Sequence, residues 1–308
     1  MSDLLCMGEA MAEFNALPPE PDGRTLFLAG YGGDTSNVAI AAARQGAKAG
    51  FLGAVGQDAP GDSLMALWRR EGVETATVFR DSAAQTGIYF VSHDEGGHHF
   101  LHYRKGSAAS CFGPDGLAPM RPAIRAARIL FASGISLGIS DTAADGVLAA
   151  IGMARTAGVK IGFDTNYRPR LWPPVRAAAL MHAAMADADY VFPGQEDAAI
   201  LTGLTDPDAV VDFYLRLGAG VVVLKMGAAG AIVADQHGRA RIPAYPVVAV
   251  DATGAGDTFC GAFLARILAG DTSQDAARYG VVAAALKCLG HGAVAPIPTA
   301  AEVVASLG

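Results

Sequence analysis

Asp251-Ala-Thr-Gly-Ala-Gly-Asp-Thr-Phe259 places three small residues, Gly254 to Gly256, directly before a segment of helical period that ends near Ala269. A helix N-terminus carries unpaired backbone N–H groups and partial positive charge, and glycine lets an anion approach them closely. Asp257 falls in the first turn of this predicted helix, where a carboxylate can accept a hydroxyl proton beside a bound phosphoryl group. The stretch therefore indicates an anion hole with a general base; the simpler interpretation is an acid that complements the helix dipole.

Around this stretch, short apolar runs alternate with longer alanine-rich segments of helical period. Such alternation predicts an α/β fold, with a mostly parallel sheet covered by helices on both faces. The expected strands are Leu4–Gly8, Ala49–Val55, Ile129–Ala132, Val159–Asp164, Tyr190–Phe192, Val221–Lys225 and Ala231–Asp235. The expected helices are Thr35–Gln45, Pro60–Glu71, Thr142–Thr156, Pro174–Ala186, Asp197–Thr202, Pro207–Leu217, Gly256–Ala269 and Ser273–Leu289. With no internal repeat or linker in the sequence, a single domain is predicted over residues 1–308.

Two segments break the alternation and predict a second, small β-layer. Residues 85–104 hold two β-rich runs around a glycine-containing turn, which is typical of a hairpin. Residues 10–29 form another non-helical insert after the first strand. These two inserts, called the lid below, are expected to cover the site or to form a dimer surface. The alternative is a hairpin that extends the main sheet.

The composition narrows the class of protein. Hydrophobic residues make up 52% of the 308 residues and charged residues 17%, which is enough for a large core. The formal net charge of −7 argues against a nucleic-acid-binding protein. There is no apolar run long enough for a membrane span and no recognisable signal peptide. The cysteines, whose spacing fits neither a disulfide framework nor a zinc site, favour a cytoplasmic protein.

Further segments carry residues suited to a ligand. Gly32-Gly-Asp-Thr-Ser-Asn37 precedes a predicted helix, and its glycines allow close approach to a ligand. Asp164-Thr-Asn-Tyr-Arg168 follows a strand at the edge where α/β proteins bind ligands, and its arginine suits a carboxylate or a phosphate. Lys225–Gly230 is a glycine-rich turn whose backbone can pass close to a nucleotide, and Tyr103-Arg-Lys105 closes the hairpin. Their structural alternatives are a helix cap, a surface arginine, a plain turn and a solvated hairpin end.

One pattern points to different chemistry, that of serine hydrolases. Gly134-Ile-Ser-Leu-Gly138 fits the nucleophile-elbow pattern, with Asp251 and His291 as the remaining triad candidates. The elbow needs a helix that starts at the serine, whereas the sequence delays the helix to Thr142. This delay disfavours a hydrolase.

A histidine-rich stretch raises the question of a metal site. The histidines lie on the predicted hairpin without a carboxylate or cysteine at ligand spacing, which favours a solvated hairpin. They are His93, His98, His99 and His102. Walker A and Gly-x-Gly-x-x-Gly motifs do not occur in the sequence, so P-loop and dinucleotide-binding folds lose support.

Taken together, the motifs resemble those of a known family. Asp251–Asp257 is similar to the C-terminal signature of the ribokinase-like (PfkB) carbohydrate kinases, with Ala252 where many members have threonine. Gly32 to Asn37 and Gly53 to Gly61 are similar to the N-terminal signature. Within the family, several segments most resemble members that phosphorylate the sugar acid 2-keto-3-deoxygluconate. These segments are Gly8-Glu-Ala10, Tyr103–Ser110, Ser133-Gly-Ile135 and Asp164–Trp172.

The resemblance implies a ribokinase-like fold and ATP-dependent phosphorylation of the terminal hydroxyl of a sugar acid. It implies that Asp257 is the base and that Gly254, Ala255 and Gly256 form the anion hole. It implies ATP and Mg²⁺ as cofactors, with a monovalent cation as a further candidate. The implied sugar-acid pocket consists of Gly33, Asp34, Asn37, Tyr89, Tyr103, Arg104, Arg168 and Asp257. The implied ATP-binding residues are Asn166, Arg168, Lys225, Gly227, Gly230, Gly254, Ala255 and Gly256.

The chain departs from the family pattern at two places. The family's Asn-x-x-Glu motif, linked to Mg²⁺ and phosphate, reads Gly194-Gln-Glu-Asp197, so the acid is expected to be Asp197 or Glu196, acting through water. A substrate-contacting acid of some members is replaced by His291.

Two other functions stay open at this point. One is a kinase for a neutral sugar such as ribose or fructose, which would not need Arg104 and Arg168. The other is a non-catalytic regulator that binds a sugar or a nucleotide. The expected partners are a small sugar acid and ATP, without nucleic acid or membrane, and the exposed lid edge predicts a homo-oligomer.

Overall fold

The computed structural model describes residues 1–308 apart from 19, 95–96, 187 and 308. Its main sheet has the strand order β13-β12-β11-β10-β9-β8-β1-β4-β5. Only β12 and β13 run antiparallel to their neighbours in the described ladders, so the mostly parallel sheet is confirmed. Its strands are β1 Leu4–Met7, β4 Ala49–Gly56, β5 Val78–Asp81, β8 Ile129–Ser133, β9 Lys160–Asp164, β10 Tyr190–Phe192, β11 Val221–Lys225, β12 Ala231–Asp235 and β13 Gly238–Ile242.

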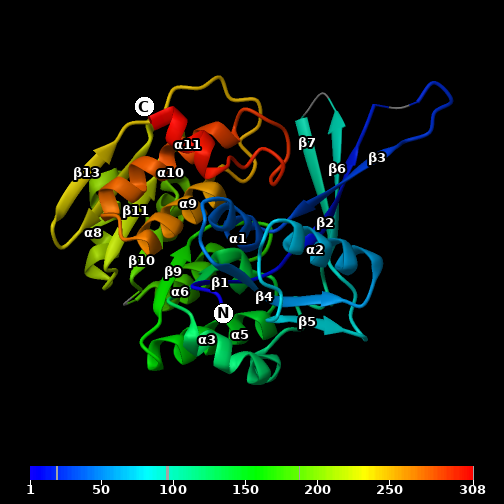
Figure 1. The fold of residues 1–308 in the computed structure, drawn as a ribbon, viewed down its shortest axis with the longest axis horizontal. Coiled ribbons are helices and arrows are strands. Elements are labelled where there is room, and N and C mark those ends of the chain that lie inside the picture. Colours follow the sequence, from blue (N-terminus) through cyan, green and yellow to red (C-terminus); the bar gives the residue numbers. More distant parts are fainter. Residues whose placement is uncertain (19, 95–96, 187, 308) are drawn as a thin grey trace.

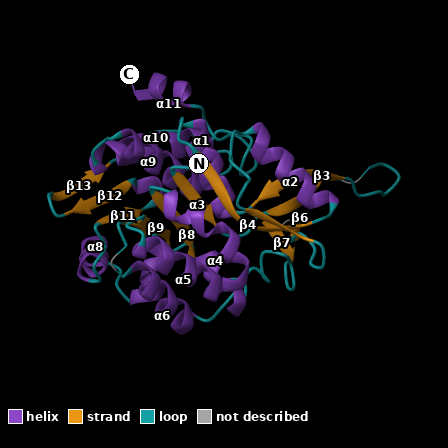
Figure 2. Cartoon of the chain, turned by 60° about the horizontal axis from the view of Figure 1, so that its bottom comes forward, coloured by secondary structure: helices purple, strands orange, loops and turns teal. Residues whose placement is uncertain are grey.

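Helices cover both faces of this sheet (Figures 1 and 2). Successive strand residues point to opposite faces, so Leu4 and Cys6 join one core cluster while Leu5 and Met7 join the other. One layer holds α1 Asp34–Arg44, α2 Ala59–Arg70, α9 Ala255–Ala269 and α10 Ser273–Lys287, with α11 Ala300–Leu307 packed on α10. The other holds α3 Arg121–Ala126, α4 Gly134–Gly138, α5 Asp141–Thr156, α6 Pro174–Met185, α7 Gln195–Thr202 and α8 Pro207–Arg216. Short 3₁₀ turns lie at η1 Pro114–Met120 and η2 Gly227–Ala229.

The lid forms a sheet of its own beside the main body (Figure 1). Its strands are β2 Met11–Ala16, β3 Phe27–Gly32, β6 Ile88–Asp94 and β7 Gly97–Tyr103, in the order β3-β2-β6-β7. The predicted second β-layer is therefore confirmed, and a hairpin that extends the main sheet is wrong. Met11, Tyr89 and Val91 bury a small cluster inside the lid, while Leu28 and Leu101 are more than half exposed on it.

Most predicted core elements agree with the structure to within one or two residues at each end. The expected delay of the helix to Thr142 is wrong, because the short helix α4 begins at Gly134. The hydroxyl of Ser133 accepts the N–H of Ser136 and so caps α4 at its start. The edge strands β5 and β13 and the terminal helix α11 were not expected from the sequence.

Candidate active site

Several of the predicted site residues lie at the carboxyl ends of the parallel strands, whereas Tyr89 and Tyr103 lie on the lid strands β6 and β7. Glu9 follows β1, Asp164 ends β9 and Lys225 ends β11. The N-termini of α1 and α9 face this edge, and a hydrogen bond between their first turns joins them. Ligands of open α/β sheets bind at this edge, so the topology alone brings the two terminal motifs to one place.

Asp257 lies in the first turn of α9, where Asn37 Nδ2 donates a hydrogen bond of 2.8 Å to its Oδ2 atom. Burial, with the nearby carboxylates of Asp34 and Asp164, raises the pKa of Asp257 to about 7. Asn37 and Lys225 oppose this rise because they favour the charged form. A carboxylate with this pKa is suited to accept a proton near neutral pH.

The small residues before Asp257 form the turn that the sequence predicts to bind an anion. Gly254 caps α9 with a left-handed φ of 77°, and a Cβ atom there would lie 3.2 Å from the carbonyl oxygen of Ala293. The N–H group of Ala255 donates a hydrogen bond of 3.1 Å to the carbonyl oxygen of Ala252. The N–H groups of Gly256 and Asp257 have no intramolecular acceptor among the described residues. The predicted anion hole would therefore consist of these two N–H groups, with Gly254 and Ala255 as its support.

A positive charge borders this turn. Lys225 Nζ donates to Asp164 Oδ2 at 2.5 Å, and a Cβ atom on Gly256 would lie 3.3 Å from the same ammonium. Burial alone would lower the pKa of Lys225, but Asp164 raises it well above its usual value. The thiol of Cys260 also donates to Asp164 Oδ2, at 3.3 Å. The ion pair with Asp164 therefore favours the charged form of Lys225 beside this turn.

Two buried oxygens in the same place have no partner. Asp34 Oδ2 accepts from Asn166 Nδ2 at 3.0 Å, but Asp34 Oδ1 and Asn37 Oδ1 have no hydrogen-bond partner among the described residues. Buried polar atoms are nearly always paired in proteins. These unpaired acceptors are therefore suited to the hydroxyl groups of a ligand.

The two arginines predicted to bind a substrate carboxylate have different surroundings. Arg104 Nε donates to Glu9 Oε2 at 2.8 Å, and its Nη2 contacts the same oxygen. Glu9 is only 1% exposed, and burial raises its pKa although Arg104 opposes this. Arg168 is exposed, and its Nη1 donates to the carbonyl of Tyr167 at 3.1 Å. The guanidinium of Arg168 is thus accessible to an anion, while that of Arg104 neutralises Glu9.

The tyrosines assigned to the sugar pocket also differ. The hydroxyl of Tyr89 donates to Glu13 of the neighbouring lid strand, and burial together with Glu13 raises the pKa of Tyr89. Tyr103 is exposed at the end of β7. Glu9 and Glu13 did not emerge as site residues from the sequence, although an acid directly after the apolar strand β1 was a visible signal.

The turns assigned to the sugar and to ATP depend on glycine for conformational reasons. A Cβ atom on Gly33, whose φ is 126°, would lie 2.5 Å from the carbonyl oxygen of Glu9. A Cβ atom on Gly230, whose φ is 88°, would lie 2.1 Å from the carbonyl oxygen of Ile242. Gly227 has a φ of 55° and open space around it. Gly33 and Gly230 are therefore required by the backbone itself, whereas Gly227 leaves room for a ligand.

The acids of the altered motif lie at the start of α7. Asp197 Oδ2 accepts from Thr165 Oγ1 at 3.0 Å and from the N–H of Tyr167 at 3.1 Å. Burial raises the pKa of Asp197, with a contribution from Asp164, whereas Glu196 is exposed. No cluster of three or more metal-ligating side chains occurs in the described part of the chain. The side chains of His93 and His98 lie outside the described residues.

The hydrolase pattern has no supporting geometry. The hydroxyl of Ser136 is buried and donates to the carbonyl of Met7 at 3.1 Å, with the hydroxyl of Ser133 at 3.2 Å. His291 is exposed, and Asp251 accepts hydrogen bonds from the backbone N–H groups of Thr253 and Gly292. Ser136 therefore joins β1 to α4 and faces no base.

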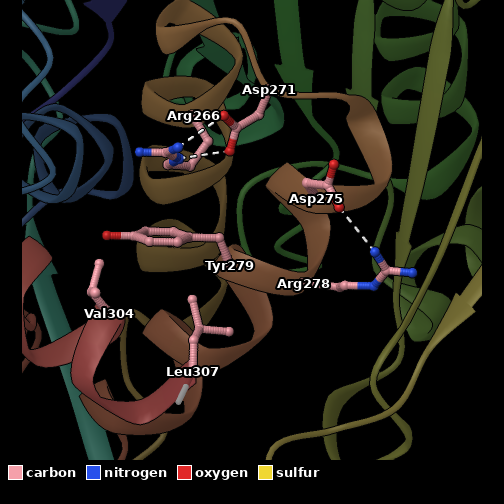
Figure 3. A pocket seen from close by; sticks show the side chains of 7 residues that line it. All are labelled: Arg266, Asp271, Asp275, Arg278, Tyr279, Val304 and Leu307. Atoms are coloured by element: carbon pink, nitrogen blue, oxygen red, sulfur yellow. Dashed lines mark hydrogen bonds and ion pairs between the residues drawn. The ribbon is translucent and has the colours of Figure 1, made fainter.

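A pocket between α9, α10 and α11 lies apart from this site (Figure 3). Its charged side chains pair with each other, Arg266 with Asp271 at 2.7 Å and Arg278 with Asp275 at 2.9 Å. The charges of this pocket are therefore neutralised within the protein, and it lacks the unpaired acceptors found around Asp34.

The fold and the site define a carbohydrate kinase. The family model described as "pfkB family carbohydrate kinase" matches residues 1–300, and the chain belongs to this family. The resemblance inferred from the motifs is thereby confirmed, as is the ribokinase-like fold with its small separate sheet.

Individual relatives extend the comparison. A 2-dehydro-3-deoxygluconokinase from Thermoproteus tenax is 34% identical over 310 residues, covering 98% of this chain and 94% of the relative. The enzyme of the same name from Bacillus subtilis (strain 168) is 32% identical over 314 residues, covering 99% and 95%. The crystal structure of a fructokinase with bound ATP from Xylella fastidiosa matches with a TM-score of 0.89 at 26% identity, covering 100% of this chain and 98% of the other.

Proposed function

We propose that the protein transfers the γ-phosphoryl group of ATP to the terminal hydroxyl of 2-keto-3-deoxygluconate, giving 2-keto-3-deoxy-6-phosphogluconate. The observation that carries the proposal is Asp257, a partly buried carboxylate beside an anion hole and a cation. The substrate class follows from two relatives named for 2-dehydro-3-deoxygluconate, which is the same compound, and from the accessible guanidinium of Arg168.

In the proposed mechanism, the sugar hydroxyl lies next to Asp257, and Asp34 Oδ1 and Asn37 Oδ1 accept neighbouring hydroxyls. Asp257 takes the proton as the hydroxyl oxygen attacks the γ-phosphorus in line and the bond to the ADP oxygen breaks. The N–H groups of Gly256 and Asp257 and the ammonium of Lys225 stabilise the charge on the transferred group. Burial of the base keeps it protonatable near neutral pH.

Mg²⁺ would neutralise phosphate charge when bound. Asp197 suits such a role through water, because both of its described hydrogen bonds engage Oδ2 and neither engages Oδ1. Mg²⁺ commonly keeps several waters and uses one or two carboxylates together with the phosphates of the substrate. Asn166, Lys225, Gly227 and Gly230 would contact ATP, since they lie at the strand ends around the anion hole.

The lid would cover the sugar. Tyr103 ends β7, and Arg104, the next residue, contacts Glu9 just after the first strand of the main sheet. Its exposed apolar side chains, including Leu28 and Leu101, are suited to a second copy of the chain, so we propose a homodimer formed through the lid.

All four described cysteines are free, which fits a cytoplasmic enzyme. No described helix has the length and apolar character of a membrane span.

The test is ADP release by the purified protein with Mg-ATP and one of five acceptors. The acceptors are 2-keto-3-deoxygluconate, its galactose-derived epimer, gluconate, fructose and ribose, with D257N as the blank. Turnover confined to the keto-acids supports the proposal. Turnover with fructose or ribose instead keeps the kinase but contradicts the acid pocket. Nucleotide binding without turnover of any acceptor would favour a regulator.

A further inference from the structure

Lys287 is a fully buried cation that the reaction scheme does not use. It is the last residue of α10, and its side chain is 0% exposed. Its ammonium donates to the carbonyl oxygen of Asp251 at 2.7 Å, and no described carboxylate forms an ion pair with it. A lysine is almost never fully buried without a paired charge, so the position of Lys287 calls for a function.

The ammonium lies where two loops meet. Val250 N donates to the carbonyl of Cys288 at 2.7 Å. Asp251 Oδ2 accepts from the N–H of Gly292 and Oδ1 from that of Thr253, both at 2.8 Å. These hydrogen bonds, together with Lys287, lower the pKa of Asp251 to about 2 although burial opposes this. The lysine and the aspartate therefore join residues 250–254 to residues 287–292.

The joined loops lead directly into the anion hole. Gly254 caps the start of α9 and lies against the backbone of Ala293, which follows the second loop. The direction of the N–H groups of Gly256 and Asp257 therefore depends on how these two loops are held. The charges of both Asp251 and Asp257 act on the Lys287 ammonium, which places it within electrostatic range of the base.

We propose that Lys287 is a positioning residue: its ammonium is a built-in cation that holds the 250–254 loop in the conformation needed for the anion hole. This inference rests on the proposed phosphoryl transfer. Since the chain supplies its own cation at this place, a free monovalent cation is not needed there by the wild-type protein. Removal of the side chain leaves a space lined by the Asp251 carbonyl that a small cation can enter.

The test compares K287A and K287M with the wild type, with K48A as the control because Lys48 is exposed. ADP release is measured in chloride salts of tetramethylammonium, ammonium and potassium at one ionic strength. We expect kcat of both variants to fall about 10–100-fold, the size that misplacement of reacting groups causes. Ammonium or potassium should restore K287A in part but not K287M, whose side chain still fills the space. Wild type and K48A should not respond.

A second measurement makes the outcome independent of turnover. The Tm of K287A, and not that of K287M or K48A, should rise with ammonium or potassium relative to tetramethylammonium. If the wild type releases no ADP with any acceptor, the proposed function is contradicted. The Tm values in the three salts still test the cation site in that case. Wild-type kcat in both variants, or equal losses without any cation-specific recovery in kcat and Tm, would overturn the role of Lys287.

Discussion

The amide of Asn37 donates a hydrogen bond of 2.8 Å to the carboxylate of Asp257, across 220 positions of sequence. Asn37 lies in the first turn of α1, and Asp257 lies in the first turn of α9. The contact orients the proposed base and stabilises its charged form. The two motifs that resemble family signatures are therefore parts of one chemical unit.

The pH dependence of turnover should depend on the hydrogen bond between Asn37 and Asp257. Because the pKa of Asp257 is raised to about 7, kcat/KM should fall about tenfold per pH unit below that value. N37A removes a hydrogen bond to the charged form, so the pKa of Asp257 rises further and the acid limb moves to higher pH. Rates from pH 5 to 9 check this. Q236A, which changes an exposed amide, should keep the wild-type limb, and an N37A limb at or below the wild-type position would contradict the assignment.

Replacement of the base should separate activity from stability. D257N should lose at least about 10²–10⁴-fold in kcat. Its Tm should exceed that of the wild type above about pH 7, because a buried carboxylate beside Asp34 and Asp164 destabilises the folded state when charged. This gain should vanish as the pH falls towards about 4, where the carboxyl is protonated in both states. Near-normal turnover of folded D257N would show that another group is the base; D115N, at an exposed acid, is the control.

Arg168 should decide between acidic and neutral sugars. R168A should lower kcat/KM for 2-keto-3-deoxygluconate by about tenfold or more, since a charge-assisted hydrogen bond is lost. Turnover of fructose, where measurable, should change far less. Equal losses for both substrates would mean that Arg168 serves ATP alone. R170A, at an exposed neighbouring arginine, controls for the loss of surface charge.

Arg104 should behave as a structural partner of Glu9. R104A leaves the buried carboxylate of Glu9 unpaired, which we expect to lower the free energy of unfolding by about 3–5 kcal/mol. The double variant E9Q/R104A should recover a large part of this loss, because no unpaired charge is left. Urea unfolding of the two variants checks this. A stable R104A with a selective defect on the keto-acid would instead assign Arg104 to the substrate.

The lid should control the oligomeric state. L28K and L101K place charges on its exposed apolar side chains and should shift the protein towards monomer in sedimentation velocity. V175K, at an exposed valine of α6, is the matched control and should sediment as the wild type. Unchanged sedimentation of all three variants would rule out the lid as the interface.

The core of the fold was predictable because its strands are buried on both faces and read as uninterrupted apolar runs. The seven predicted strands all occur. The edge strands β5 and β13 were not predicted, because an edge strand does not need an uninterrupted apolar run. Gly238–Ile242 carries two arginines, and Val78–Asp81 ends in Arg-Asp. The short α4 was missed since a single capped turn, fixed by Ser133, has too few residues for a periodic signal.

The glycine positions of the candidate site were predictable where the backbone needs glycine, as at Gly254 with its φ of 77°. Side-chain pairing was not, because it depends on distant segments. Glu9 meets Arg104 across 95 positions, and Tyr89 meets Glu13 across 76. A sequence motif shows which groups are present at a strand end, but the charge that satisfies each one is fixed only by packing.

The lid is formed by two segments that are separated in the sequence. β2 and β3 lie between β1 and α1, and β6 and β7 between β5 and η1, so both leave the main sheet and return to it. The segments from β8 to α11, which include Lys225 and Asp257, are uninterrupted by it. Most of the lid is thus encoded apart from Lys225 and Asp257, whereas Arg168, the arginine proposed to bind the substrate carboxylate, lies in the same stretch as these two. Recombination that exchanges the two lid segments between relatives would therefore change the cover over the proposed acceptor site while Arg168, Lys225 and Asp257 stay in place.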